Sequence, residues 1–209
     1  MMNLGETEED YETTTNALEA NSYQLTIITS IADGYAALAH LQARIKVLHV
    51  APEQCFHKRF RSMKNLTYIT ADLGSPLADV KLDIQEMPFE DNEFDIIICN
   101  HVLEHVADDH KAMSEIFRVL KQGGFALLQV PIDYSAEKTY EDSTITDPKE
   151  REKHFRQRDH YRLYGKDYLK RLKEVGFNLR EENYLFVLSE TERERFKLPA
   201  MEFMYGYYK

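Results

Sequence analysis

The chain has 209 residues and few cysteines, and this scarcity excludes two classes of protein. Cys55 and Cys99 supply neither the four ligands of a structural zinc site nor the framework of a disulfide-rich secreted domain. No apolar run approaches the roughly 20 residues that cross a bilayer. The start of the chain is acidic, where a signal peptide would be basic and then apolar. We therefore expect a cytoplasmic protein without a membrane segment.

Lysine and arginine are absent from residues 1–43, which carry seven acidic residues. With a formal net charge of −10, the whole chain does not resemble a nucleic-acid binder. Residues 149–173 form one strongly basic stretch, with ten basic and four acidic residues interleaved with aromatic side chains. Such a stretch either forms a solvated helical face or holds an anionic substrate.

Short apolar runs alternate with helical patterns from residue 45 onward. Strands are predicted over residues 45–50, 66–71, 80–82, 94–99, 125–130, 177–187 and 202–208, and helices over 55–63, 110–120 and 167–175. Residues 121–124, with two glycines, are expected to end the second helix. This order predicts an α/β fold, a Rossmann-like doubly wound sheet of seven mostly parallel strands with helices on both faces and an antiparallel last strand.

The predicted domain organisation has three parts. Residues 1–43 form an acidic tail followed by one or two helices, and residues 44–209 form the α/β domain. Within it, residues 133–165 are too long for a simple crossover and are expected to form a cap over the substrate.

In an open α/β sheet, ligands bind beyond the carboxyl ends of the strands, where the strand order reverses. The residues directly after each predicted strand are therefore the candidate binding residues. Asp72 stands about 20 residues after the first strand turn, where a carboxylate can accept hydrogen bonds from ribose hydroxyls. A turn-forming aspartate at a strand end explains the same residue equally well.

The stretch from residue 83 to 128 carries several motifs in a fixed order. Asp83-Ile84 is followed by Met87-Pro88-Phe89 with Asp91, and then by the runs FDIIICNHVLEHV, RVLKQGG and FALLQV. This stretch resembles the class I S-adenosylmethionine-dependent methyltransferases of the type 11 kind, and the resemblance extends over about residues 45–209. It implies S-adenosylmethionine as the cofactor, with Asp72 on the ribose and Asp83 with Ile84 on the adenine. The implied cofactor-binding residues are His49, Ala51, Pro52, Glu53, Asp72, Leu73, Asp83, Ile84, Asn100 and His101.

The turn after the first strand departs from the family pattern. The family has a glycine-rich turn there, whereas this chain has HVAPEQC, in which His49 replaces the usual acid. A positive φ is costly for Ala and impossible for Pro, so we expect the loop to follow another path. A domain that keeps the fold and binds a partner without catalysis is therefore the main alternative to an enzyme.

The resemblance implies methyl transfer to a small-molecule acceptor, with a base where the acceptor must lose a proton. The candidate bases are His101, His105 and His160. Arginines in the basic stretch suggest an anionic acceptor, and the candidate substrate-binding residues are Asp133, Tyr134, Arg158 and Arg162. We expect no nucleic-acid or membrane partner, and either a monomer or a homodimer.

Two other enzyme classes share single features with the chain. The run from His101 to His105 fits the H-x-x-E-H pattern of inverted zinc peptidases, but five residues are a short match, so we expect no metal site. A nicotinamide-dependent dehydrogenase would share Asp72 but needs a G-x-G-x-x-G turn, which is missing. The longer match favours the methyltransferase.

Overall fold

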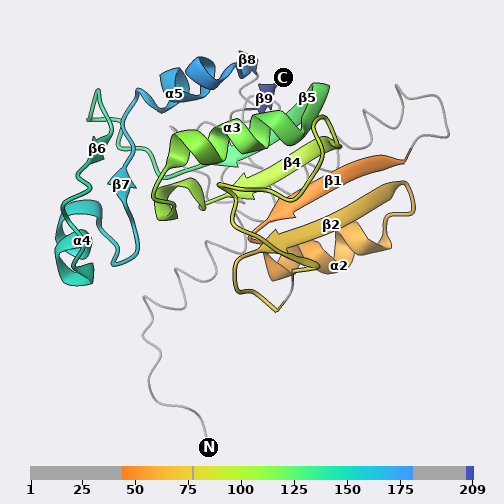
Figure 1. Ribbon diagram of the computed structural model, residues 1–209, viewed down its shortest axis with the longest axis horizontal. Helices are drawn as coiled ribbons and strands as arrows, with labels where there is room; N and C mark the ends of the chain where they lie inside the picture. Colours follow the sequence, from red (N-terminus) through yellow and green to blue (C-terminus); the bar gives the residue numbers. More distant parts are fainter. Residues whose placement is uncertain (1–43, 77, 181–205) are drawn as a thin grey trace, which may run out of the picture. The chain divides into compact units, whose positions relative to one another are not determined.

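The computed structural model describes residues 44–76, 78–180 and 206–209, which fall into two units (Figure 1). One unit holds the sheet and contains residues 45–52, the described residues of 66–180, and 206–209. The described residues of the other unit are residue 44 and residues 53–65, which include helix α2 (Gln54–Ser62). The predicted tail and helices of residues 1–43, and the predicted strand residues 181–187 and 202–205, lie outside the described residues.

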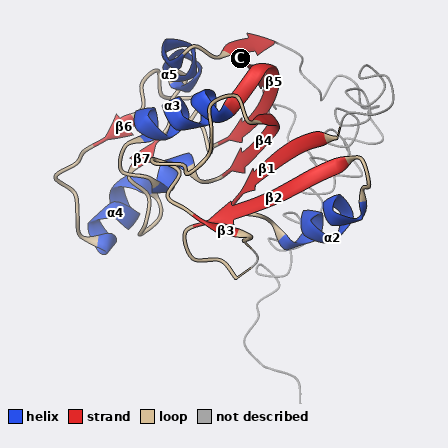
Figure 2. Ribbon diagram, turned by 45° about the vertical axis from the view of Figure 1, so that its right-hand side comes forward, coloured by secondary structure: helices blue, strands red, loops and turns tan. Residues whose placement is uncertain are grey.

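The sheet unit is built on seven strands in the order β3-β2-β1-β4-β5-β9-β8. Strands β1 to β5 run parallel, and β9 is antiparallel to both of its neighbours. This arrangement confirms the predicted doubly wound sheet with an antiparallel last strand. The order reverses between β1 and β4, which lie side by side near the middle of the sheet (Figure 2). The strands are β1 (Ile45–Val50), β2 (Leu66–Asp72), β3 (Val80–Lys81), β4 (Phe94–Asn100), β5 (Leu120–Gln129), β8 (Asn178–Arg180) and β9 (Gly206–Tyr208).

Apolar residues on both faces of the central strands explain why the sheet is parallel and buried. In β4, the successive residues Ile96, Ile97 and Ile98 are all at most 1% exposed. A continuous run of β-branched residues suits a strand covered on two faces, since neither face can be left to water.

Helices α3 (Asp109–Val119) and α5 (Tyr168–Val175) lie on one side of the sheet and contact each other (Figures 1 and 2). Helix α3 begins where the Asp108 side chain accepts a hydrogen bond from the backbone N–H of Lys111, a standard N-cap. Helix α5 ends at Gly176, whose φ of 120° is open to glycine alone without strain.

The end of α3 differs from the prediction. The helix ends at Val119, and Leu120 is already extended and pairs with Phe94 as the first residue of β5. The two glycines therefore lie inside the irregular start of β5 and do not cap the helix. Gly123 has a φ of 74°, and a Cβ on Gly124 would lie 2.8 Å from the carbonyl oxygen of Lys121. Both positions thus need glycine because of the bend in this strand.

The segment predicted as a cap has secondary structure of its own. Strands β6 (Tyr140–Glu141) and β7 (Arg162–Leu163) pair antiparallel, and helix α4 (Pro148–Phe155) lies between them in the chain. A short 3₁₀ helix, η1 (Leu103–His105), follows β4 and contacts β7. None of the described helices has both the length and the apolar character needed to cross a membrane.

Candidate functional site

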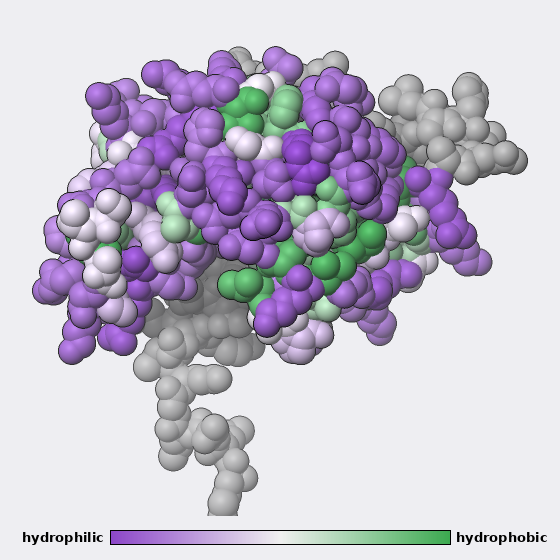
Figure 3. Space-filling model, viewed as in Figure 1, coloured by the Kyte–Doolittle hydropathy of each residue, from purple (hydrophilic) through white to green (hydrophobic). Residues whose placement is uncertain are grey.

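A cavity of about 310 Å³ lies beyond the carboxyl ends of β1 to β4, where the strand order reverses. This is where an open α/β sheet places its ligands. Apolar side chains show among hydrophilic ones over these strands on the face seen in Figure 3. The residues that line the cavity are Val50, Ala51, Asp72, Leu73, Leu82, Asp83, Ile84, Gln85, Val102, His105, Val106, Ala107 and Tyr161.

Two carboxylates reach this cavity from neighbouring strand ends. The Oδ1 atom of Asp72 accepts hydrogen bonds from the backbone N–H groups of Gly74 and Ser75, each at 2.6 Å. Since both bonds go to Oδ1, Oδ2 can accept hydrogen bonds from a ligand. The Asp83 carboxylate is held by Gln85, through its backbone N–H at 2.8 Å and its side-chain amide at 3.1 Å. Both carboxylates are therefore fixed in place before a ligand arrives.

Apolar side chains form the wall between these carboxylates and η1. Leu82 and Ile84 are each 5% exposed, and Val102 and Val106 also pack against the main hydrophobic core. A cavity with apolar walls and two fixed carboxylates can hold a flat ring that carries hydrogen-bond donors. A nucleoside has both features.

The turn after β1 corrects one prediction. Ala51 has a φ of 50°, so it takes the left-handed conformation that glycine would adopt without strain. Its backbone N–H donates to the carbonyl oxygen of Ala71 at 2.8 Å. We expected a loop path that avoids a positive φ, and this expectation was wrong, because Ala51 adopts a positive φ in spite of its steric cost. His101, after the adjacent strand β4, has a similar φ of 53°.

Several predicted cofactor residues lie outside the lining of the cavity. His49 is fully buried in the sheet, with its Nδ1 atom 2.8 Å from the Tyr68 hydroxyl. Pro52 and Asn100 are buried, whereas the His101 side chain is 60% exposed. Glu53 is the N-cap residue of α2, in the other unit. Of the ten predicted residues, the cavity brings together Ala51, Asp72, Leu73, Asp83 and Ile84.

Of the candidate bases, His105 lines the cavity, and His160 does not line it but contacts His105. The two rings meet edge to face with centroids 4.6 Å apart. His160 is 4% exposed, and its pKa is lowered, first by burial and then by the nearby His105. The neutral imidazole is therefore the favoured form of His160. His101 does not share a helical face with His105, since it directly follows β4 while His105 ends η1, so the peptidase-like pairing does not form.

The predicted substrate-binding arginines have other partners. Arg162 is 3% exposed and donates hydrogen bonds to the carbonyl oxygens of Leu103, Val106 and Ala107 at 2.6–2.8 Å, so it holds η1 in place. Arg158 pairs with Glu152 at 2.8 Å. Of the other two predicted substrate residues, Asp133 pairs with Arg156, and Tyr134 is 41% exposed. None of the four lines the cavity.

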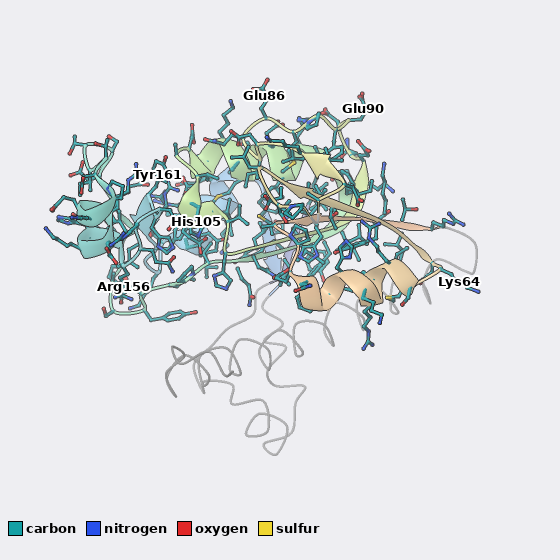
Figure 4. The ribbon with its side chains drawn as sticks, turned by 90° about the horizontal axis from the view of Figure 1, so that it is seen from below. Lys64, Glu86, Glu90, His105, Arg156 and Tyr161 are labelled. Atoms are coloured by element: carbon teal, nitrogen blue, oxygen red, sulfur yellow. The ribbon has the colours of Figure 1, made fainter. Side chains whose placement is uncertain are left out.

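Sequence reasoning missed Tyr161, which comes to the cavity from the cap segment (Figure 4). Its backbone N–H donates to the carbonyl oxygen of Glu104 at 2.8 Å, and its ring stacks on Arg151 at 3.9 Å. No periodicity marks such a residue, since its position depends on how the cap folds against η1. The other lining residues fall into three groups. Val50 and Leu82 are the last residues of predicted strands, Gln85 and Val102 lie three residues beyond predicted strands, and Val106 and Ala107 directly follow η1.

Comparison with known proteins finds similarity to methyltransferases over part of this chain. Residues 32–128 match the family model of a methyltransferase domain. The ubiquinone/menaquinone biosynthesis C-methyltransferase UbiE of Idiomarina loihiensis is 45% identical over 49 residues, or 23% of this chain and 20% of that protein. The uncharacterized protein MJ1123 of Methanocaldococcus jannaschii is 31% identical over 125 residues, or 59% of this chain and 55% of that protein. The chain thus spans between a fifth and just over half of these curated relatives.

Among solved structures, the [4+2]-cyclase SpnF is similar in fold, with a TM-score of 0.52 and 16% identity. The match covers 86% of this chain and 79% of that one, and it shows the fold alone. The family match falls on the strands and strand ends that build the cavity. Over residues 32–128 the chain is therefore similar to methyltransferase domains, and its fold is one that such domains share.

Proposed function

We propose that the chain binds S-adenosylmethionine in this cavity and transfers its methyl group to a small-molecule acceptor. The observation that carries the proposal is the convergence of Asp72 and the pair Asp83-Ile84 in one cavity at the point where the strand order reverses. These are the positions that a class I methyltransferase uses for the nucleoside of its cofactor.

The residues present fit the nucleoside end of this cofactor. The free Oδ2 atom of Asp72 suits ribose hydroxyls, and the Asp83 carboxylate suits the adenine amino group, because carboxylates accept hydrogen bonds from both. Leu82 and Ile84 offer an apolar surface to the ring. A volume of about 310 Å³ lies within the range of small-molecule sites.

When bound, the cofactor supplies an electrophilic methyl group on its sulfonium centre. The protein's contribution is to hold the nucleoside, align the acceptor and exclude water. Of the three candidate histidines, His105 lines the cavity, and a group that touches the acceptor must lie there.

The structure reduces the support for an anionic acceptor. Arg158 pairs with Glu152, Arg156 pairs with Asp133, and Arg162 is bound to backbone carbonyls. These guanidinium groups are already satisfied, so we propose a small-molecule acceptor without assigning it a charge.

Isothermal titration of the full chain with S-adenosylmethionine and with S-adenosylhomocysteine tests the cofactor site. We expect micromolar affinity, about −8 kcal/mol. Asp72→Asn and Asp83→Asn keep the size of each side chain and remove its charge, so each should weaken binding roughly ten- to hundredfold, since a hydrogen bond to a charged group contributes roughly 1.5–3 kcal/mol.

Glu86→Gln is the matched control, since Glu86 is an exposed carboxylate three residues from Asp83 that does not line the cavity. Its affinity should match that of the unmodified chain. If neither ligand binds, the proposal fails and the domain is a methyltransferase fold that works as a binding module. If both ligands bind but no acceptor in a broad screen gives S-adenosylhomocysteine, the cofactor site stands and the methyl transfer does not.

A further inference from the structure

We propose that Glu104, His105 and His160 bind one divalent transition-metal ion, with Zn²⁺ as the best-fitting example. One ligand atom of each of these side chains lies within 4.8 Å of the other two. Sequence spacing does not group these three residues, because His160 is 55 positions after His105 and the H-x-x-E-H pattern pairs His105 with His101.

Two segments of the chain are tied together at this cluster. Glu104 and His105 belong to η1, and His160 directly precedes Tyr161, whose backbone N–H donates to the carbonyl oxygen of Glu104. Arg162 fixes the carbonyl groups on both sides of η1. The backbone that carries the three side chains is therefore held in place by hydrogen bonds that do not involve the side chains themselves.

An oxygen atom lies beside the Nδ1 atom of each histidine ring. The Nδ1 atom of His160 lies 3.1 Å from the carbonyl oxygen of Phe155, and that of His105 lies 3.0 Å from a carboxylate oxygen of Asp159. Both oxygens are acceptors, so they suit the tautomer that carries its proton on Nδ1 and leaves the lone pair of Nε2 available to a metal. Metal-binding histidines have this arrangement, in which an oxygen behind the ring fixes the tautomer.

Two polar atoms in the cluster are buried without a hydrogen-bond partner. They are Oε2 of Glu104, on a residue that is 2% exposed, and Nε2 of His160, on a residue that is 4% exposed. Buried polar atoms are nearly always satisfied in folded proteins, so each of these atoms needs an explanation. A carboxylate oxygen and an imidazole nitrogen that carries no proton both offer a lone pair, so one cation bound between them would satisfy both atoms.

The chemistry of the three ligands indicates the class of ion. Two imidazole nitrogens and one carboxylate oxygen suit zinc and its neighbours in the first transition row, whereas magnesium and calcium prefer oxygen ligands alone. Zinc binds nitrogen and oxygen at about 2.0–2.2 Å, so the side chains need to close by only about an ångström. Three protein ligands leave a coordination position open, as in catalytic zinc sites. His105 also lines the cofactor cavity, so the ion would lie at the edge of that cavity.

Metal binding to the untagged full chain, stripped with EDTA and dialysed, tests this site without cofactor or acceptor. We expect one Zn²⁺ per chain by mass spectrometry of the bound metal, and a visible absorption band with Co²⁺ in place of Zn²⁺. Glu104→Gln, which preserves the shape of the side chain, and His160→Gln should each lower the affinity for either ion at least tenfold. Circular dichroism checks that each variant is folded.

His110→Gln is the matched control, because His110 is an exposed histidine on α3. It should bind both ions as the unmodified chain does. The proposal is overturned if the unmodified chain retains no Zn²⁺ or Co²⁺ at micromolar concentration, or if folded Glu104→Gln binds the ions with unchanged affinity. If His160→Gln fails to fold, Glu104→Gln alone decides. If the chain binds no metal, the result of the cofactor titration still stands, because that titration is carried out without metal.

Discussion

Ala51 holds a strained backbone conformation at the edge of the cavity. Its φ of 50° costs an L-residue about 1–2 kcal/mol, whereas glycine adopts it freely. Glycine also has more conformational freedom in the unfolded chain, which offsets part of the gain. The strain lies next to the proposed methionine end of the cofactor, where family members carry glycines.

We predict that Ala51→Gly raises the free energy of unfolding by about 0.5–1 kcal/mol, measured by urea denaturation. Ala136→Gly is the control, since Ala136 is a loop residue without positive φ, and this change should lower stability by about 0.5–1 kcal/mol. Equal losses in the two variants would show that Ala51 is not strained.

The interactions of Glu115 lead us to expect that the free energy of unfolding depends on pH. Its carboxylate accepts hydrogen bonds from the Arg118 guanidinium at 2.7 and 2.9 Å and from the backbone N–H of Met87 at 2.8 Å. The bond from Arg118 is the main reason why the pKa of Glu115 is below its ordinary value. A depressed carboxyl pKa stabilises the fold above the unfolded-state pKa, and this contribution is lost as the pH falls through the folded-state pKa.

The stability difference between the unmodified chain and Glu115→Gln should therefore be largest near neutral pH and shrink as the pH falls below about 4.5. Denaturation curves at several pH values between 3 and 7 measure it. Glu86→Gln, at an exposed carboxylate, should show a small difference that does not depend on pH. A Glu115→Gln difference that stays constant over this range would refute the assignment.

Among single residues, the sequence predicted the cavity residues that lie at or just after the end of a strand. Asp72 lines the cavity because it ends β2, and Asp83 and Ile84 line it because they follow β3 directly after Leu82. Arg162 could not be assigned in this way. Its partners are carbonyl groups up to 59 positions earlier in the chain, and a count of basic residues carries no information about them.

Strand β9 lies between β5 and β8 and depends on one glycine for its close approach. A Cβ on Gly206 would lie 2.3 Å from an edge carbon of the Phe125 ring, which is itself fully buried in β5. We predict that Gly206→Ala lowers the free energy of unfolding by about 1–3 kcal/mol, because the ring or the strand must shift.

Gly74→Ala provides the comparison for this variant in the same denaturation assay. Gly74 has no atom within 4 Å of an added Cβ and no positive φ, so the change should be within about 0.5 kcal/mol of zero. If Gly206→Ala were equally mild, β9 would not pack on β5 as described.

Arg162 joins β7 of the cap segment to η1. Lysine cannot present a planar fork to three carbonyl groups, so Arg162→Lys leaves buried acceptors unsatisfied. We predict a loss of about 2–4 kcal/mol in the free energy of unfolding, and faster hydrogen exchange in residues 103–107. Arg158→Lys, at an exposed ion pair, should change neither quantity appreciably, and similar results for the two variants would contradict the structural role of Arg162.

The junction of α3 and β5 shows where reading an element from sequence fails. The apolar spacing of Met113, Ile116 and Leu120 fits one helical face, so the helix was expected to reach Leu120. In the structure, pairing with Phe94 draws Leu120 into β5. Strand pairing is a tertiary contact, and it overrides a local period at the end of an element.

Over the whole molecule, the doubly wound, mostly parallel sheet was predictable because short apolar runs alternating with helices allow few other architectures. The cap could not be predicted in the same way, since its packing against η1 depends on single contacts such as those of Tyr161 and Arg162. The cluster of Glu104, His105 and His160 could not be predicted for the same reason. Patterns in the sequence relate residues that are close along the chain, whereas the fold brings His160 into contact with His105.

The central claim is that the cavity where the strand order reverses holds the nucleoside of S-adenosylmethionine. A crystal structure of the chain soaked with S-adenosylhomocysteine tests it most directly. We expect the ribose hydroxyls to donate hydrogen bonds to the Asp72 carboxylate. We expect the adenine ring to lie against Ile84, with its amino group facing Asp83. Density for the ligand at any other place, or a cavity that stays free of ligand at saturating concentration, would contradict the account.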